Sequence, residues 1–287
     1  MERDTRTRGE TSARERTVAD LSDWRVIAVS GSEGHGWLDD LVTADLRGLE
    51  RGQARRSLLL TPTGAVLASF TVTPWEDGLL LLQDGAEPRA IDGLLARFVL
   101  SSDVRLEDVT GRYAVLAFPS ETAPRTTAEG IAPSPFGTGW MVLGPIAERE
   151  RLASIDGGSA RPIEGDELEA WRIEAGVVRV GVDTAETSLP EEAGLLDAVA
   201  FDKGCFLGQE SVARVRNTGH PRHLVVTLES DDALMAGEPL LAEGEAAGEV
   251  TSAVRREATT YAVARVAWDR RDAELSSARG VVVRRRD

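Results

Sequence analysis

Lysine and cysteine are almost absent from this chain: Lys203 is the only lysine and Cys205 the only cysteine among 287 residues. A single cysteine excludes an internal disulfide. With only three histidines beside it, it also leaves too few ligands for a structural zinc site, or for an iron–sulfur cluster held by this chain alone. We therefore expect no metal site within the chain.

Long apolar runs are missing too. The longest candidate, Leu79–Leu82, is far shorter than the ~18 residues of a membrane span. Residues 1–17 alternate arginine with acidic residues and threonine and have no apolar centre. That pattern predicts a disordered tail and no secretory signal. Together these features predict a cytoplasmic protein that does not contact membranes.

Basic residues are outnumbered by acidic ones, giving a net charge of −15 and a pI near 4.8. This balance argues against non-specific nucleic-acid binding, which needs a broad basic surface. The motifs G-x-G-x-x-G and G-x-x-x-x-G-K-[ST] are absent as well, so no nucleotide cofactor is indicated. One dense basic stretch, residues 203–223, contains Arg214 and Arg216. Such a stretch suits either a binding loop or a solvated strand face.

Apolar periodicity predicts short strands, a few helices and a C-terminal barrel. We expect helices at Gly36–Leu46, Ala90–Val99 and Glu167–Glu174, and a hairpin across Thr61–Gly64. The segment Pro119–Pro135, rich in Pro, Ser, Thr and Ala, is expected to be a loop. After Arg222, short strands separated by glycine and acidic turns are typical of a small barrel.

The sole lysine and the sole cysteine lie two residues apart, on either side of Gly204. A thiol reacts as the thiolate, and a nearby ammonium group favours that form. Gly204 permits a turn that would bring Lys203 and Cys205 together. The alternative is a buried cysteine that acts as a small hydrophobic residue. A pairing of Cys205 with His220 is also conceivable, but no nucleophile elbow such as G-x-S-x-G is present.

The octapeptide KGCFLGQE, residues 203–210, resembles the signature K-G-C-[FY]-x-G-Q-E of the YgfZ-type relatives of the glycine-cleavage aminomethyltransferase (T-protein). Further matches accompany it. VIAVSGSEGHGWLDDLVTADL resembles the strand, turn and helix near the family's N-terminus, and SLLLTPTGAVLASFTV resembles its hairpin. WRIEAG resembles the family's R-x-E-x-G segment. The similarity extends over nearly the whole chain from about Val18.

This resemblance implies an α+β fold in which two α+β subdomains enclose a central cavity, followed by a C-terminal β-barrel. The implied organisation is a tail at 1–17, a folate-binding body at 18–217 and a barrel at 218–287. The implied cofactor is tetrahydrofolate or a one-carbon derivative. The residues expected to act chemically are Cys205 and Lys203. Those expected to bind the cofactor are Glu174, Arg172, Gly204, Gly208, Gln209, Glu210, Arg214 and Arg216.

Within that set, Glu174 is implied to meet the pterin ring. Arg172 and the basic loop around Arg214 and Arg216 are inferred from charge to meet the glutamate tail. The implied role is an accessory protein for iron–sulfur clusters, including those of tRNA-modifying enzymes, with iron–sulfur enzymes or assembly factors as possible partners.

A folate-dependent aminomethyl- or methyltransferase is the alternative function. Against it, the helix after LLLLQDGA offers only Asp92 where the aminomethyltransferases place an aspartate that orients the reactive folate nitrogen. Asp92 is one or two residues out of register and lies off the helix's apolar face. A third possibility is an interaction module that keeps the fold and binds no ligand.

Overall fold

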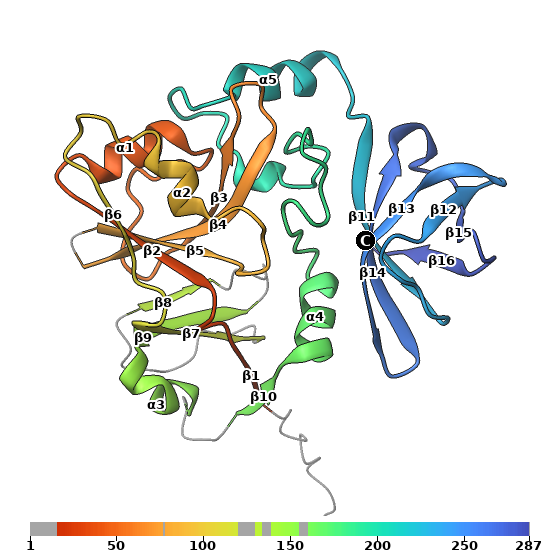
Figure 1. The fold of residues 1–287 in the computed structure, drawn as a ribbon, viewed down its shortest axis with the longest axis horizontal. Coiled ribbons are helices and arrows are strands. Elements are labelled where there is room, and N and C mark those ends of the chain that lie inside the picture. The colour runs from red at the N-terminus through yellow and green to blue at the C-terminus, as the bar shows by residue number, and fades with distance from the viewer. Residues whose placement is uncertain (1–15, 77, 120–129, 134–138, 155–159, 287) are drawn as a thin grey trace, which may run out of the picture.

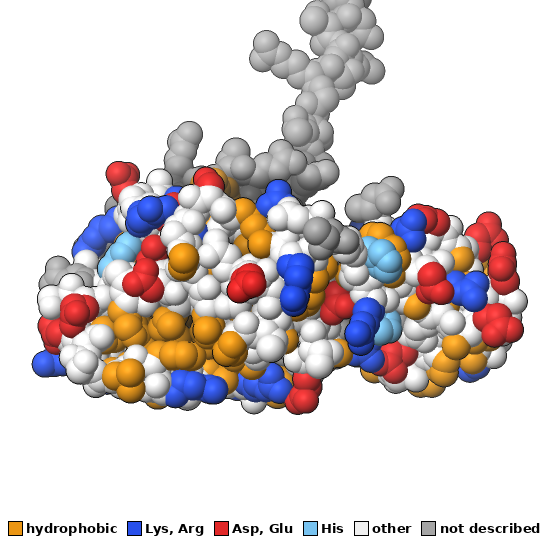
Figure 2. Space-filling view, turned by 90° about the horizontal axis from the view of Figure 1, so that it is seen from above, with side chains coloured by type: hydrophobic (Ala, Val, Ile, Leu, Met, Phe, Trp, Pro, Cys, Tyr) orange, Lys and Arg blue, Asp and Glu red, His pale blue; other side chains and the backbone are white. Residues whose placement is uncertain are grey.

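The computed structural model describes residues 16–76, 78–119, 130–133, 139–154 and 160–286. These residues form a body with two β-sheets and a separate C-terminal barrel (Figure 1). Figure 2 looks down on the side that carries α1 (Gly34–Leu41) and α5 (Gln209–Thr218). Hydrophobic side chains gather on the body in this view, whereas charges of both signs are scattered over the barrel.

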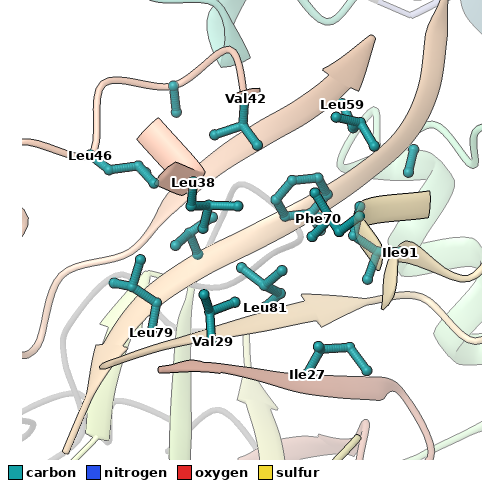
Figure 3. Close-up of a cluster of buried hydrophobic side chains, with 14 of the residues drawn as sticks. Ile27, Val29, Leu38, Val42, Leu46, Leu59, Phe70, Leu79, Leu81 and Ile91 are labelled. Carbon is teal, nitrogen blue, oxygen red and sulfur yellow. The ribbon is translucent and has the colours of Figure 1, made fainter. Parts of the chain in front are cut away.

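The first sheet of the body has the strand order β3-β4-β5-β2-β6, and every neighbouring pair is antiparallel. Successive side chains along each strand point to opposite faces of the sheet. In β5, Leu79 and Leu81 face the helices α1 and α2 (Ile91–Ala96), while Leu80 and Leu82 face the second sheet. Figure 3 shows the cluster on the helix side. The strands are β2 (Arg25–Ser30), β3 (Arg55–Leu60), β4 (Val66–Trp75), β5 (Gly78–Gln83) and β6 (Arg105–Asp108).

The second sheet has the order β10-β1-β7-β9-β8. Val115 and Ala117 of β7 face the first sheet, and Leu116 between them faces α3 (Arg149–Ala153) and its neighbours. The body is therefore layered, with α1 and α2 on one outer face, α3 on the other and a shared apolar seam between the sheets. The strands are β1 (Thr17–Asp20), β7 (Tyr113–Phe118), β8 (Gly130–Pro133), β9 (Trp140–Pro145) and β10 (Arg161–Ile163), and η1 (Ile146–Glu148) precedes α3.

The C-terminal barrel is closed in the order β11-β14-β13-β12-β15-β16 and has an apolar core of its own. Helix α4 (Gly165–Glu174) stands between the body and the barrel (Figure 1). Ala170 and Ile173 of α4 pack on Val254 and Val263 of the barrel. The strands are β11 (His223–Ser230), β12 (Pro239–Ala242), β13 (Glu245–Arg256), β14 (Thr259–Ala267), β15 (Leu275–Ser277) and β16 (Val282–Arg285), with η3 (Leu196–Ala198) before the barrel and η4 (Trp268–Arg270) after β14.

The fold class predicted from the sequence is confirmed, but several elements differ in extent. Helix α1 ends at Leu41 rather than at position 46, because Val42 becomes extended and bridges to Leu59 beside β3. Part of the expected loop at 119–135 is the strand β8, which pairs with β9; positions 120–129, 134 and 135 lie outside the described residues. Strand β15 is three residues long and carries too little pattern to be expected. Thr17, expected in the tail, already belongs to β1.

Candidate functional site

The signature segment Lys203–Glu210 crosses the surface between η3 and α5, and its side chains point in different directions. Cys205 is exposed to solvent. Phe206, the next residue, is buried in the cluster that contains Leu60 and Val212. Leu207 packs against the helix-side core of the first sheet. The thiol is thus presented outward from a backbone that is pinned on its C-terminal side by two apolar anchors.

Lys203 pins the same segment on its N-terminal side. Its side chain is buried, and Nζ donates hydrogen bonds to the carbonyl oxygens of Asp39 (2.5 Å), Val42 (3.0 Å) and Ala44 (2.7 Å) and to Oδ1 of Asp39 (3.2 Å). Burial lowers the pKa of Lys203, although Asp39 acts in the opposite direction. The ammonium also lies at the carboxyl end of α1, where a positive charge is favourable.

These contacts bear on the chemical role expected for Lys203. Gly204 would permit a turn that brings the ammonium of Lys203 to the thiol of Cys205, but the hydrogen bonds of the ammonium go to acceptors 159–164 positions earlier in the chain. The geometry therefore assigns Lys203 a positioning contact that fastens the Cys205 segment to the end of α1.

The two glycines of the segment differ in what the fold requires of them. Gly208 has a φ of +81°, and a Cβ there would lie 2.4 Å from the carbonyl oxygen of Thr61 in the β3–β4 turn. That position requires glycine on both counts. Gly204 has no positive φ, and a Cβ there would meet nothing within 4 Å. The fold gives no steric reason for glycine beside Cys205.

The basic stretch that follows is a helix, which corrects its expected loop conformation. Gln209 and Glu210 form the first turn of α5, with Gln209 half-buried and Glu210 exposed. Arg214 and Arg216 are exposed on the same helix, and the guanidinium of Arg216 lies 4.0 Å from the ring centroid of Phe201. The residues around Arg214 and Arg216 therefore form an ordered helix and not a binding loop.

Arg172 is not available to a ligand. Its side chain is 1% exposed, and its guanidinium donates to both carboxyl oxygens of Glu169, to Oδ2 of Asp183 and to the carbonyl of Val177. A buried guanidinium with this set of acceptors is a structural ion-pair centre. We expected Arg172 to bind the glutamate tail of a folate. The structure instead places it in this ion-pair centre.

Glu174, expected to meet a pterin ring, instead faces the barrel. Its carboxylate lies 4.0 Å from a guanidinium nitrogen of Arg256. Burial raises the pKa of Tyr261, and a hydrogen bond with Glu174 adds to the rise. Both partners belong to β13 and β14, so Glu174 lies at the seam between α4 and the barrel.

A small polar cavity that the sequence did not indicate lies between the first sheet and the chain that follows α4. It has a volume of about 20 Å³, enough for roughly one water molecule. Its charged lining residues are Arg56, Asp84 and Glu87, and Trp24 forms part of its wall. Arg56 shares a strand face with Leu58 and Leu60, which lie in the core. A charged residue on an inward strand face was the signal in the sequence.

Glu87 is 3% exposed, and burial raises its pKa to about 7. Its Oε2 accepts hydrogen bonds from Gln83 Nε2 (3.0 Å) and the backbone N–H of Ser69 (3.3 Å), and its Oε1 accepts one from the N–H of Val180 (3.2 Å). Perturbed carboxyl groups beside a cavity are typical of functional sites. Glu87 is therefore a candidate functional residue that the sequence analysis missed.

Comparisons with known proteins identify the family of the chain. The GCVT N-terminal domain family matches residues 7–119. The iron–sulfur cluster assembly factor IBA57 homolog, mitochondrial, of Mycosarcoma maydis is 31% identical over 228 residues, covering 71% of this chain and 54% of that protein. The tRNA-modifying protein YgfZ of Enterobacter sp. (strain 638) is 23% identical over 223 residues, covering 71% of this chain and 68% of that protein.

Among solved structures, the glycine cleavage system aminomethyltransferase T from Bartonella henselae superposes with a TM-score of 0.76 at 19% identity, covering 95% of this chain and 85% of that one. The chain is a YgfZ-type member of the glycine-cleavage T-protein superfamily. It spans about half the length of its M. maydis relative.

The superfamily fold implies a reduced folate, and the donor set of this YgfZ-type chain can be tested against it. The residues expected to bind folate do not line one site, because Arg172 is buried in ion pairs and Glu174 faces the barrel. The cavity beside Glu87 has a volume of only about 20 Å³, which is room for roughly one water molecule. The arrangement of these described residues therefore does not fit a folate ring.

Two further observations concern the described part of this YgfZ-type chain. None of its helices is long and apolar enough to cross a membrane. No group of three or more His, Cys, Asp or Glu side chains there stands ready to hold a metal ion.

Proposed function

We propose that this chain is an accessory protein that supports the assembly or repair of iron–sulfur clusters, including those of tRNA-modifying enzymes. The support from relatives is that the M. maydis match is an iron–sulfur cluster assembly factor and the Enterobacter match is a tRNA-modifying protein. Iron–sulfur enzymes or assembly factors are the corresponding partners. The cytoplasmic location stays a prediction of the sequence, and one of these relatives is mitochondrial.

The observation that carries the proposal is the presentation of Cys205. The only thiol of the chain is exposed, while Lys203 and Phe206 on either side of it are buried and anchored. Gly204 leaves open space beside the thiol without any steric need for glycine. An accessible sulfur on a fixed backbone is suited to transient contact with a cluster or with a partner protein.

The folate part of the proposal is that the body binds tetrahydrofolate. It is supported by the superfamily fold. When bound, a reduced folate would supply one-carbon or redox chemistry that the side chains lack. The alternative, a folate-dependent aminomethyl- or methyltransferase, receives no support from Asp92, which lies outside the buried face of α2.

The test of the thiol is genetic complementation. In a strain that lacks the protein, wild-type chain should restore the activity of an iron–sulfur tRNA-modifying enzyme, and Cys205→Ser should not. Asp202→Asn, exposed in the same segment, is the matched control and should restore activity fully. Full rescue by Cys205→Ser would remove the thiol from the proposal. Turnover of tetrahydrofolate with an aminomethyl donor would support the transferase instead.

A further inference from the structure

A local reversal of charge follows the signature segment. The chain has a net charge of −15, yet residues 211–228 contain no aspartate or glutamate. The basic residues of this stretch are all exposed and are called the basic surface below: Arg214, Arg216, His220, Arg222 and His223. They run from α5 into β11, the first strand of the barrel. Figure 2 shows basic side chains gathered where the body meets the barrel.

An aromatic side chain of the barrel holds part of this basic surface in place. The ring of His220 stacks on Trp268 of η4, with ring centroids 5.4 Å apart and planes at 6°. The backbone N–H of Trp268 donates to the carbonyl oxygen of Arg222 at 2.9 Å. The guanidinium of Arg271, which pairs with Asp272, lies 4.5 Å from the centroid of the same indole. Arg271 therefore adjoins the basic surface at the barrel.

The arginines of the basic surface keep their charge available to a partner. Among the residues that the structure describes, no salt bridge engages the side chain of Arg216 or Arg222. The guanidinium of Arg216 lies over the ring of Phe201 instead. The carboxylate of Glu192 accepts from two backbone N–H groups, one of them that of Arg222. Asp269 is exposed at the barrel end of the surface, so acidic residues lie at its margin.

The aromatic rings decide between two kinds of anionic partner. Single-stranded nucleic acid is held by bases that stack on open aromatic faces, but Phe201 and Trp268 already contact basic side chains of this chain. The net charge of −15 also opposes a long polyanion. An acidic patch on a protein is smaller. Because salt screens exposed charges beyond about 8 Å, such a patch responds mainly to the local basic surface.

We propose that the basic surface docks an acidic face of the protein that meets Cys205. This inference rests on the proposed function and names the surface chemistry of its partner. Arg216 lies over Phe201, and Phe201 packs against the apolar cluster that holds Phe206, the neighbour of Cys205. The basic surface therefore begins close to the thiol and leads away from it along α5. Charge pairs of this kind guide encounter and fix the orientation of the partner.

Fluorescence anisotropy of the full-length chain with a labelled glutamate decamer measures the surface by itself. At about 50 mM NaCl the wild type should bind the decamer, and added salt should weaken the binding. Arg216→Glu/Arg222→Glu should bind it about tenfold or more weakly than wild type. Arg51→Glu/Arg105→Glu, which makes the same change of charge near the far end of β4, is the matched control and should bind as wild type does. Thermal unfolding verifies that each variant is folded.

Complementation of the deletion strain relates the surface to the proposed function. Arg216→Glu/Arg222→Glu should restore less than about half of the enzyme activity that wild type restores, and the control variant should restore it fully. Full rescue by Arg216→Glu/Arg222→Glu while Cys205→Ser fails would overturn this inference and leave the proposed function standing. Full rescue by Cys205→Ser would overturn both, because no partner would then need the thiol.

The titration can overturn the inference independently. It fails if the wild type does not bind the glutamate decamer at low salt, or if Arg216→Glu/Arg222→Glu binds it equally well. Tighter binding of a uridine decanucleotide that is lost in the same variant would assign the surface to nucleic acid instead. If the variant does not fold, Arg216→Gln/Arg222→Gln replaces it, because glutamine removes both charges without reversing them; wild-type affinity in that variant would again overturn the inference.

Discussion

At the scale of single residues, Lys203 and Cys205 are two residues apart and have opposite environments. The ammonium of Lys203 is enclosed by three carbonyl oxygens and a carboxylate, whereas the thiol of Cys205 is open to solvent. A compact ammonium with rotatable donors suits this ring of acceptors better than a planar guanidinium does. The only lysine of the chain therefore marks a structural requirement that arginine cannot meet.

Chemical labelling checks this difference directly, because each residue is the only one of its kind. We expect a maleimide to modify Cys205 fully in the folded chain. Reductive methylation should modify Lys203 more slowly by about tenfold or more in the folded chain than in the chain unfolded by urea. Mass spectrometry locates each modification. Equal rates at Lys203 in the folded and the unfolded chain would contradict the buried contact.

Glu87 makes stability depend on pH at the same scale. Burial raises its pKa from 4.5 to about 7 in the folded chain, and Asp84 adds to the rise, while hydrogen bonds from Gln83, Val180 and Ser69 oppose it. The folded state therefore holds this proton more tightly than the unfolded state does. The resulting stabilisation is complete below pH 4.5 and is lost as the pH rises to about 7, a loss of about 3 kcal/mol.

Urea unfolding of wild type and Glu87→Gln across this range measures the effect. Relative to the variant, the wild type should lose free energy of unfolding as the pH rises from about 5 to about 8. Comparison with the variant cancels the contributions of all other carboxylates. If the free energies of unfolding of wild type and Glu87→Gln changed in parallel with pH, Glu87 would be ionised over this whole pH range.

At the scale of elements, the turn between β3 and β4 and the start of α5 hold the signature segment in place. Gly64 in the turn has a φ of +85°, and a Cβ there would lie 2.9 Å from the side chain of Ser211. Gly208 faces it with equally little room. The backbones of the β3–β4 turn and of the start of α5 are therefore in close contact. This contact holds the segment that carries Cys205 in place.

Alanine substitution of Gly208, compared with that of Gly204, tests this backbone contact. Gly208→Ala should cost about 2 kcal/mol or more, since it adds a positive-φ penalty to a backbone clash. Gly204→Ala, four residues away with open space at its Cβ, should change the free energy of unfolding by no more than about 0.5 kcal/mol. Urea denaturation compares them. Similar losses in both variants would mean that the close approach at Gly208 is unimportant.

At the scale of the whole molecule, Asp183 joins the body to the barrel. It is fully buried, and its carboxylate accepts hydrogen bonds from Arg172 and the backbone of Arg179 on one oxygen and from Thr251 and Ser252 on the other. The register of β13 shifts between Val250 and Ser252. That bulge brings two consecutive hydroxyls onto one carboxylate oxygen, which regular strand alternation would forbid.

Asp183→Asn should loosen this joint by about 3 kcal/mol, because its amide group would meet donors in place of an acceptor. We expect a lower urea midpoint and faster hydrogen exchange in β13. Asp231→Asn, which alters an exposed pair with Arg284, is the matched control and should show little change. If β13 of Asp183→Asn exchanged its amide hydrogens at the wild-type rate, apolar packing on α4 alone would hold the barrel in place.

The sequence by itself determined the local elements and the family. The apolar run Leu79–Leu82 and the hairpin turn at Thr61–Gly64 depend on neighbours a few residues apart, so both can be recognised in the sequence. The singular Lys203 and Cys205 could be found by counting, and the octapeptide around them carried the resemblance that the comparisons confirmed.

Only the tertiary structure decided where the side chains of that site point. Lys203 turns to acceptors near Asp39, Glu174 to the barrel and Arg172 to Asp183. The carboxyl group of Glu87 is buried by the first sheet and by the chain after α4. Each of these outcomes depends on contacts between residues distant in the chain, since burial and charge pairing are properties of the packed molecule. No local pattern contains them.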